Sequence, residues 1–90
     1  MIIDLGTIRT IDALHSDLER GLKFPSFYNN NWESLRRVLS DDKQQERITL
    51  LNYSQFTSRF PAEGKTFSRL IEDYNHRSRR TGSRGRIEVM

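Results

Sequence analysis

Apolar residues recur along the chain in short runs, and their spacing predicts an alternation of strands and helices. Residues 2–5 include Ile2, Ile3 and Leu5, an apolar run that fits a first strand. A helix should follow from Thr10 or Asp12, because both residues suit a helix start. Its apolar positions recur at intervals of three and four residues and share one face: Ile11, Leu14, Leu18 and Leu22.

A second helix is predicted after a segment of aromatic and polar residues. Asn31 is a favourable N-cap, and the residues that follow it form an apolar face: Trp32, Leu35, Val38 and Leu39. Residues 47–53 then combine β-branched and nearly continuous apolar character. That pattern is typical of a buried strand.

The last third of the chain predicts more helix and a final strand. Phe56 and Phe60 lie four residues apart, which fits a helical turn ended by Pro61. The clearest helical stripe follows: Phe67, Leu70, Ile71 and Tyr74. Gly82 and Gly85 bracket a turn before residues 86–90, whose alternation predicts a strand.

Strands separated by helices imply parallel neighbours joined by right-handed crossovers. We therefore expect an α/β fold, with a small three-stranded parallel sheet covered by three to four helices in a single domain over residues 1–90. The apolar fraction is 34%, there is no cysteine, and no apolar run approaches the ~20 residues that span a bilayer. A cytoplasmic protein without membrane contact is the expectation.

Charge is unevenly distributed along the chain. The net charge is +3, and residues 76–86 read HRSRRTGSRGR, with five arginines and no acid. A nucleic acid could bind this run, with Tyr53, Phe27 and Tyr28 stacking on bases. Alternatively, the arginines offset the negative end of a helix dipole and solvate a loop.

Catalytic patterns are weak. His15 and His76 are far apart in sequence and lack metal-ligand spacing, so a packed His15 and a dipole-complementing His76 in the last turn of a helix are preferred. No glycine-rich phosphate loop opens a helix, and no serine stands in a nucleophile-elbow pattern. We expect no enzyme activity, no cofactor and no metal.

In residues 24–35, FPSFYNNNWESL, three aromatic residues and three asparagines surround a proline before Trp32 opens the second helix. Phe24 and Trp32 fit inward packing, whereas Phe27 and Tyr28 are harder to bury together with the asparagines. Packing and recognition of a partner both remain open. Within the helix, Glu33 and Arg37 are four residues apart in the order that favours an ion pair.

These residues resemble the barstar-like family of small intracellular ribonuclease inhibitors. The resemblance runs along nearly the whole chain, through IDALH at 11–15, PSFYNNNW at 25–32, ESL at 33–35, QF at 55–56, and residues 48–51 and 67–74. In that family, a loop and the second helix plug a ribonuclease active site, with acidic side chains in place of substrate phosphates. The resemblance implies that Phe27 matches a loop tyrosine, Asn29 a turn glycine, Glu33 the first acid of the helix, and Asp73 a contacting glutamate.

The resemblance breaks on the second helix. Arg37 stands where the family has its most important acid, and Arg36 replaces an aromatic residue. An arginine cannot mimic a phosphate, and a cationic nuclease site would repel it. The partner should therefore differ and present an acidic or mixed surface.

We expect an immunity protein that neutralises a cognate toxin in competition between bacteria by covering its active or target-binding surface. The expected contact residues are Phe27, Tyr28, Asn29, Asn30, Glu33, Arg36, Arg37 and Asp73. One alternative is direct inhibition of a basic ribonuclease through Glu33 and Asp73. Another is a small nucleic-acid-binding protein that uses the arginine run at residues 77–86.

Overall fold

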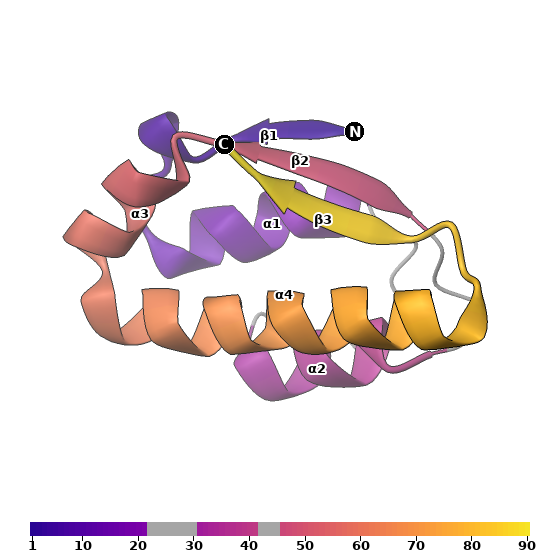
Figure 1. Ribbon diagram of the computed structural model, residues 1–90. Coiled ribbons are helices and arrows are strands. Elements are labelled where there is room, and N and C mark those ends of the chain that lie inside the picture. Colours follow the sequence, from indigo (N-terminus) through magenta and orange to yellow (C-terminus); the bar gives the residue numbers. More distant parts are fainter. Residues whose placement is uncertain (22–30, 42–45) are drawn as a thin grey trace.

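The computed structural model describes residues 1–21, 31–41 and 46–90, and it shows a parallel sheet with helices packed beneath it (Figure 1). The strands are β1 (Ile2–Asp4), β2 (Arg47–Leu51) and β3 (Arg86–Val89), in the order β1-β2-β3. The helices are η1 (Leu5–Thr7, a 3₁₀ turn), α1 (Ile11–Gly21), α2 (Trp32–Leu39), α3 (Tyr53–Arg59) and α4 (Pro61–Thr81). The expected α/β fold with a three-stranded parallel sheet is confirmed.

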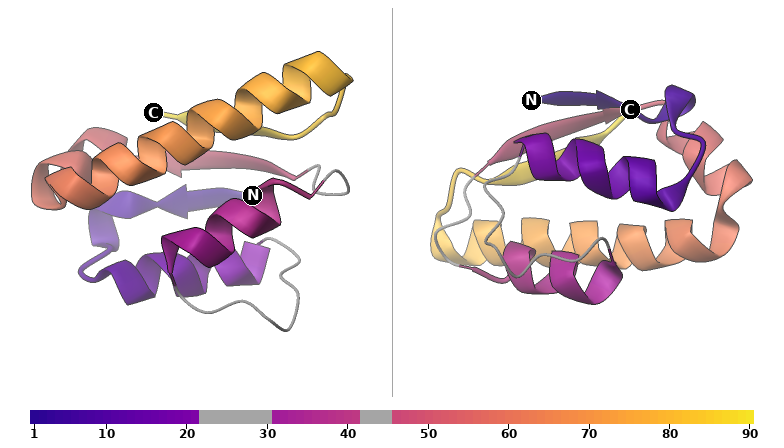
Figure 2. Two further views of the ribbon diagram at one scale, coloured as in Figure 1. Left: turned by 90° about the horizontal axis from the view of Figure 1, so that it is seen from below. Right: turned by 180° about the vertical axis from the view of Figure 1, so that it is seen from behind.

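Helices α1, α2 and α4 lie on one side of the sheet, as the view from behind also shows (Figure 2). Both crossovers are between neighbouring strands and lead in the same direction across the sheet. Right-handed crossovers of that kind place their helices on the same face. α2 lies farthest from the sheet, beneath α4.

The other face of the sheet is open, so the buried strand expected over residues 47–53 is covered on one face only. Ile48 and Leu50 are buried, while Arg47 is exposed and Thr49 and Leu51 are half-buried. This alternation follows from the pleat, which turns successive side chains to opposite faces. β2 is central in the sheet but is covered by helices on one face.

β2 also ends earlier than expected. Asn52 adopts a left-handed conformation (φ 59°), which asparagine tolerates better than most residues, and Tyr53 begins α3. The Asn52 amide donates to Asp4 Oδ1 at 2.8 Å and thereby joins this turn to the end of β1. Tyr53 is therefore a helical residue and not the end of a strand.

α4 is much longer than its apolar stripe suggested. Pro61 is its first residue, where the missing N–H costs nothing, and the helix continues for 21 residues. Gly82 ends it in a left-handed conformation (φ 73°), within the predicted turn. The last turn holds Arg79 and Arg80, so the expectation that His76 lies there is wrong.

The core forms between the covered face of the sheet and the helices. Asn31 caps α2 as predicted, since its Oδ1 accepts from the Ser34 N–H at 2.8 Å. Phe67 is fully buried on α4 at the centre of an aromatic cluster that includes Trp32, Tyr53 and Phe56. Trp32 is half-buried and packs inward, as its helical position predicted.

Asn75 on α4 closes the outer edge of β3. Arg86 and Met90 donate towards β2, whereas the backbone of Ile87 points away from it. The Asn75 side chain accepts from the Ile87 N–H at 2.8 Å and donates to the Ile87 carbonyl at 2.9 Å. One amide thus satisfies two backbone groups that an edge strand otherwise leaves open.

We predict that Asn75→Ala destabilises the protein by about 1–3 kcal/mol, because two hydrogen bonds to a buried residue's backbone are lost. Urea unfolding followed by circular dichroism measures the change. His76→Ala, one residue along the same helix and exposed, serves as the control. Equal losses in both variants would contradict the edge-closing role of Asn75.

His15 on α1 is fully buried, as the packed interpretation predicted, and its ring meets Trp32 edge-on at 4.9 Å. Burial lowers the pKa of His15, and the negative charge of Asp12 offsets only part of that effect. The folded protein therefore binds this proton less well than the unfolded chain, in which the pKa is about 6.5.

We predict that His15 reduces stability as the pH falls below about 6.5, the unfolded value, with a slope of at most about 1.4 kcal/mol per pH unit. The loss stops growing once the pH is below the folded pKa. Unfolding free energies from pH 7.5 downwards should show this slope. The slope should become shallower in His15→Phe and persist in His76→Gln, which retains His15. A His15→Phe variant with the wild-type slope would refute the assignment.

No helix in the three described segments is both long enough and apolar enough to cross a membrane.

Candidate functional site

α2 presents a charged outer face. Its buried side consists of Ser34, Leu35, Val38 and Leu39. Because the Asn31 cap fixes the first turn, the helical period places Glu33, Arg36 and Arg37 on the opposite, exposed side. Three of the expected contact residues therefore share one solvent-facing surface.

Glu33 and Arg36 form a two-point ion pair on this surface. Arg36 Nη2 donates to Glu33 Oε1 at 2.6 Å, and Arg36 Nε donates to Oε2 at 3.3 Å. The hydrogen bond and charge of Arg36 lower the pKa of Glu33, with a smaller contribution from the charge of Arg37. The same contact raises the pKa of Arg36. Glu33 is thus hydrogen-bonded to Arg36, while Arg37, four residues on, acts on it through its charge.

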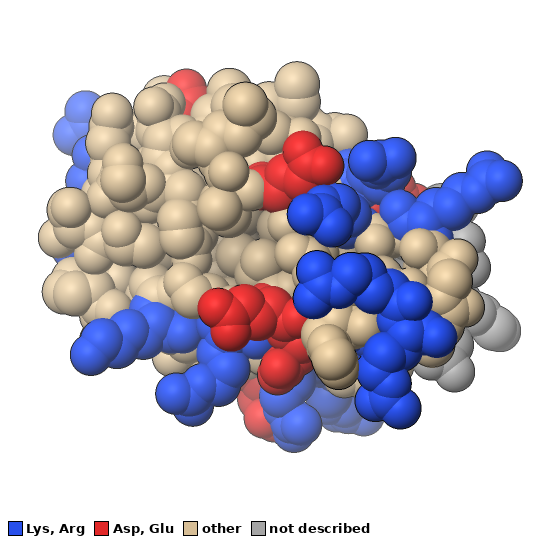
Figure 3. Space-filling view, viewed as in Figure 1, with Lys and Arg blue, Asp and Glu red and all other residues tan. Residues whose placement is uncertain are grey.

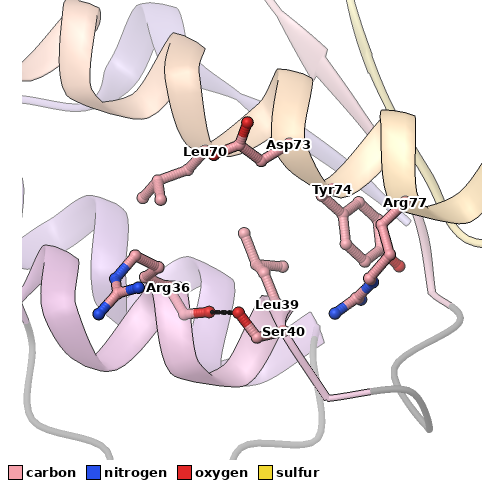
Figure 4. Close-up of a pocket in the computed structure, with 7 residues that line it drawn as sticks. All are labelled: Arg36, Leu39, Ser40, Leu70, Asp73, Tyr74 and Arg77. Carbon is pink, nitrogen blue, oxygen red and sulfur yellow. Dashed lines mark hydrogen bonds between the residues drawn. The ribbon is translucent and has the colours of Figure 1, made fainter.

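A cavity of about 160 Å³ lies between α2 and α4 (Figure 4). Apolar and charged side chains from both helices line it: Arg36, Leu39, Ser40, Leu70, Asp73, Tyr74 and Arg77. Arg36 and Asp73 stand on opposite sides of it, one from each helix. Two residues that are 37 positions apart in sequence (73 − 36) therefore line one hollow.

Arg77 connects the two helices at one end of this cavity. Its guanidinium carbon lies 5.6 Å from the centre of the Tyr74 ring, within cation–π range, and its Nη2 donates to the Asp41 carbonyl at 3.3 Å. Tyr74 is itself fixed, because its hydroxyl donates to the Glu46 carbonyl at 3.0 Å and the ring is buried. Burial also raises the pKa of Tyr74. Arg77 is therefore held in position by two contacts, one with the Tyr74 ring and one with the Asp41 carbonyl.

Of the expected contact residues, the structure brings Arg36 and Asp73 together at the cavity and leaves Glu33 and Arg37 beside it on α2. Phe27, Tyr28, Asn29 and Asn30 lie outside the described residues. Sequence reasoning missed the other cavity residues, above all Arg77, which it grouped with the arginine run. The available signal was that Arg77 follows Tyr74 by three residues and Asp73 by four, because residues at those intervals lie on the same face of a helix.

The side chains of the cavity suit binding of a partner. Among the described residues, no group of three or more histidine, aspartate or glutamate side chains could hold a metal ion. His15 is buried in the core, whereas His76 is exposed on α4, so the two histidines do not share one environment. The cavity instead offers cations, one carboxylate and an apolar floor, which suit recognition of a polar protein surface.

Comparison with protein families identifies the family of this chain. The sequence profile described as Barstar (barnase inhibitor) matches residues 1–89. The chain belongs to the barstar family. The family's description names an inhibitor, so membership indicates a protein that acts on a ribonuclease or similar toxin by binding rather than by catalysis. A search of curated proteins found no sequence that matches this barstar-family chain.

Proposed function

We propose that this barstar-family protein is an immunity protein, which binds a cognate bacterial toxin in the cytoplasm and covers its active or target-binding surface. The observation that carries the proposal is that Arg36 and Asp73 line one cavity from opposite sides, with Glu33 and Arg37 exposed on the surface of α2. Family membership supports the role of an inhibitor, and these four charged side chains offer an exposed surface that a protein partner could contact.

The charges of the cluster favour a partner with a mixed or acidic surface. The side chains of Arg36 and Glu33 remain 58% and 67% exposed, so a partner can reach the pair without unfolding α2. A carboxylate of the partner would meet Arg36 or Arg37, and a donor would meet Asp73. Such complementary pairs set specificity and association rate across an interface.

The loop that precedes α2 would supply the anchors of this interface. Aromatic side chains dominate the energetic centres of protein interfaces, which favours Phe27 and Tyr28 in that role. Asn29 and Asn30 would add hydrogen bonds beside them. This part of the proposal rests on the sequence pattern and on the family resemblance.

The test is a pull-down from lysate of the source cells with the tagged protein, in moderate salt and with nuclease added to remove bridging RNA. Mass spectrometry should identify one stoichiometric partner whose expression alone is toxic to cells. Co-expression of this protein should relieve that toxicity. Recovery of ribosomal or nucleic-acid-associated proteins alone, lost on nuclease treatment, would refute the proposal.

Direct inhibition of a basic ribonuclease through Glu33 and Asp73 is the second candidate, and the family's description favours it. The Arg36 contact weakens this candidate, because it neutralises much of the charge that Glu33 would offer. Glu33→Gln with Asp73→Asn should release ribonuclease activity if this candidate holds. Under the first proposal, reversal of Arg36 and Arg37 has the larger effect on binding.

A further inference from the structure

Arginines from three elements gather at one end of the molecule, where the strands begin and α4 ends (Figure 3). Arg79 and Arg80 lie in the last turn of α4, Arg84 lies in the following turn, and Arg86 begins β3. Arg47, from a distant part of the sequence, begins β2. All five side chains are exposed, and we call them the arginine end.

The helix dipole accounts for only part of the arginine end. Arg79 and Arg80 complement the negative C-terminus of α4, as cations commonly do. Arg47, Arg84 and Arg86 lie outside that helix, so the same reason does not apply to them. Three of the five cations therefore need another explanation.

The strand register makes this arrangement unfavourable in the protein alone. Arg47 and Arg86 are direct partners in neighbouring strands, so their side chains stand side by side on the open face of the sheet. Like charges in such positions repel one another. Glu88 is the acid that pairs with them in the described part of the chain, with its Oε1 at 3.8 Å from Arg47 Nη2 and 3.4 Å from Arg86 Nε. One carboxylate thus serves two guanidinium groups.

A local departure from favourable pairing is expected where a surface serves a ligand. We propose that the arginine end binds the phosphate backbone of a double-stranded nucleic acid without reading its sequence. Guanidinium groups bind phosphate oxygens through paired hydrogen bonds, and several of them along one surface release condensed counterions.

The surroundings of the arginine end favour a duplex over other anions. The described residues next to it, Thr81, Gly82 and Ser83, are small or polar, and a stable protein interface requires apolar or aromatic anchors at its centre. Stacking of single-stranded bases also requires exposed aromatic rings. Tyr53, which the sequence offered for stacking, is half-buried against Phe56 and Phe67, and its hydroxyl pairs with Ser68. Tyr53 is therefore not available for stacking, and Phe27 and Tyr28 lie outside the described residues.

The test measures fluorescence anisotropy of a labelled duplex of about 20 base pairs as the wild-type protein is added, from about 50 mM to about 200 mM salt. The patch variant is Arg47→Gln/Arg84→Gln/Arg86→Gln. The control variant is Arg9→Gln/Lys65→Gln/Arg69→Gln, which removes three exposed cations elsewhere. Both variants lower the net charge from +3 to 0 (3 − 3).

For five phosphate contacts, the slope of log affinity against log salt should be about −4.5 in the wild type and about −2 in the patch variant. At the lowest salt, the patch variant should bind at least about tenfold more weakly than the control variant. Glu88→Gln should bind more tightly than wild type with a steeper salt slope, an effect that a purely structural role of Glu88 does not produce. Thermal melts verify that all variants are folded.

Absence of wild-type binding at the lowest salt would overturn the proposal. Equal loss in the patch and control variants would overturn it too, because net charge alone would then explain the affinity. Equal affinity for polyglutamate of matched charge would replace the nucleic acid by an acidic polypeptide. Tighter binding to the single strand than to the duplex would overturn the phosphate-only mode.

Discussion

Phe67→Ala should lower the free energy of unfolding by about 3–5 kcal/mol, the usual cost of removing a buried phenylalanine. Phe67 is 1% exposed and lies 5.4 Å from the ring of Trp32 and 6.0 Å from that of Phe56. Its removal leaves a cavity where α2, α3 and α4 meet. Domains of this size are stable by only about 5–15 kcal/mol, so this variant should lose a large fraction of the total stability.

Urea unfolding followed by far-ultraviolet circular dichroism measures this loss. Phe67→Leu retains most of the volume and should cost less than half as much. Ile2→Ala provides the matched control, because Ile2 is apolar but 69% exposed on the open face of the sheet. Its stability should remain within about 0.5 kcal/mol of wild type. A loss in Ile2→Ala as large as that in Phe67→Ala would contradict the position of the core.

Arg36→Glu with Arg37→Glu should weaken binding to the toxin by about 2–5 kcal/mol, because charges that are desolvated in an interface cost this much when their partners mismatch. The domain itself should stay folded. The Glu33–Arg36 pair is largely exposed, and surface pairs of this kind contribute about 0–1 kcal/mol. Calorimetric titration with the partner recovered by pull-down measures the change.

Lys65→Glu with Arg69→Glu gives the same change in net charge at an exposed part of α4 and serves as the control. These two residues line a different hollow, between α3 and α4. Unchanged affinity in a folded Arg36→Glu/Arg37→Glu variant would move the interface away from α2. Equal losses in both double variants would instead show a long-range effect of charge.

The two predictions test the two sides of α2, namely its packing against Phe67 of α4 and its exposed charges. α2 is held in place by its buried side through Phe67 and its neighbours, and it offers the opposite side to a partner. Phe67→Ala should therefore reduce binding only to the extent that the protein unfolds. The charge-reversal variant should reduce binding in fully folded protein.

Much of the fold could be predicted because the relevant signals are local. The intervals between Leu14 and Leu18 predicted α1, and the Asn31 side chain predicted where α2 begins. Gly82 predicted the end of α4, because few other residues adopt its backbone conformation. The parallel sheet could be predicted because neighbouring strands that are joined through a helix run in the same direction.

The misplaced boundaries have local causes too. Pro61 ends one helix and also begins the next, and composition alone does not distinguish the two roles. Asn52 was assigned to a strand because its neighbours Leu51 and Tyr53 are apolar. A single left-handed residue is enough to end the strand there.

The sequence by itself determined the elements, their order and the barstar family, because periodicity, caps and motifs act over a few residues at a time. Only the tertiary structure decided which face of β2 is covered, that Arg36 meets Asp73 across a cavity, and that Arg47 stands beside Arg86. These pairs are 37 and 39 residues apart (73 − 36 and 86 − 47). Their meeting depends on crossover direction, strand register and helix packing, and none of these leaves a pattern in the residues near either partner.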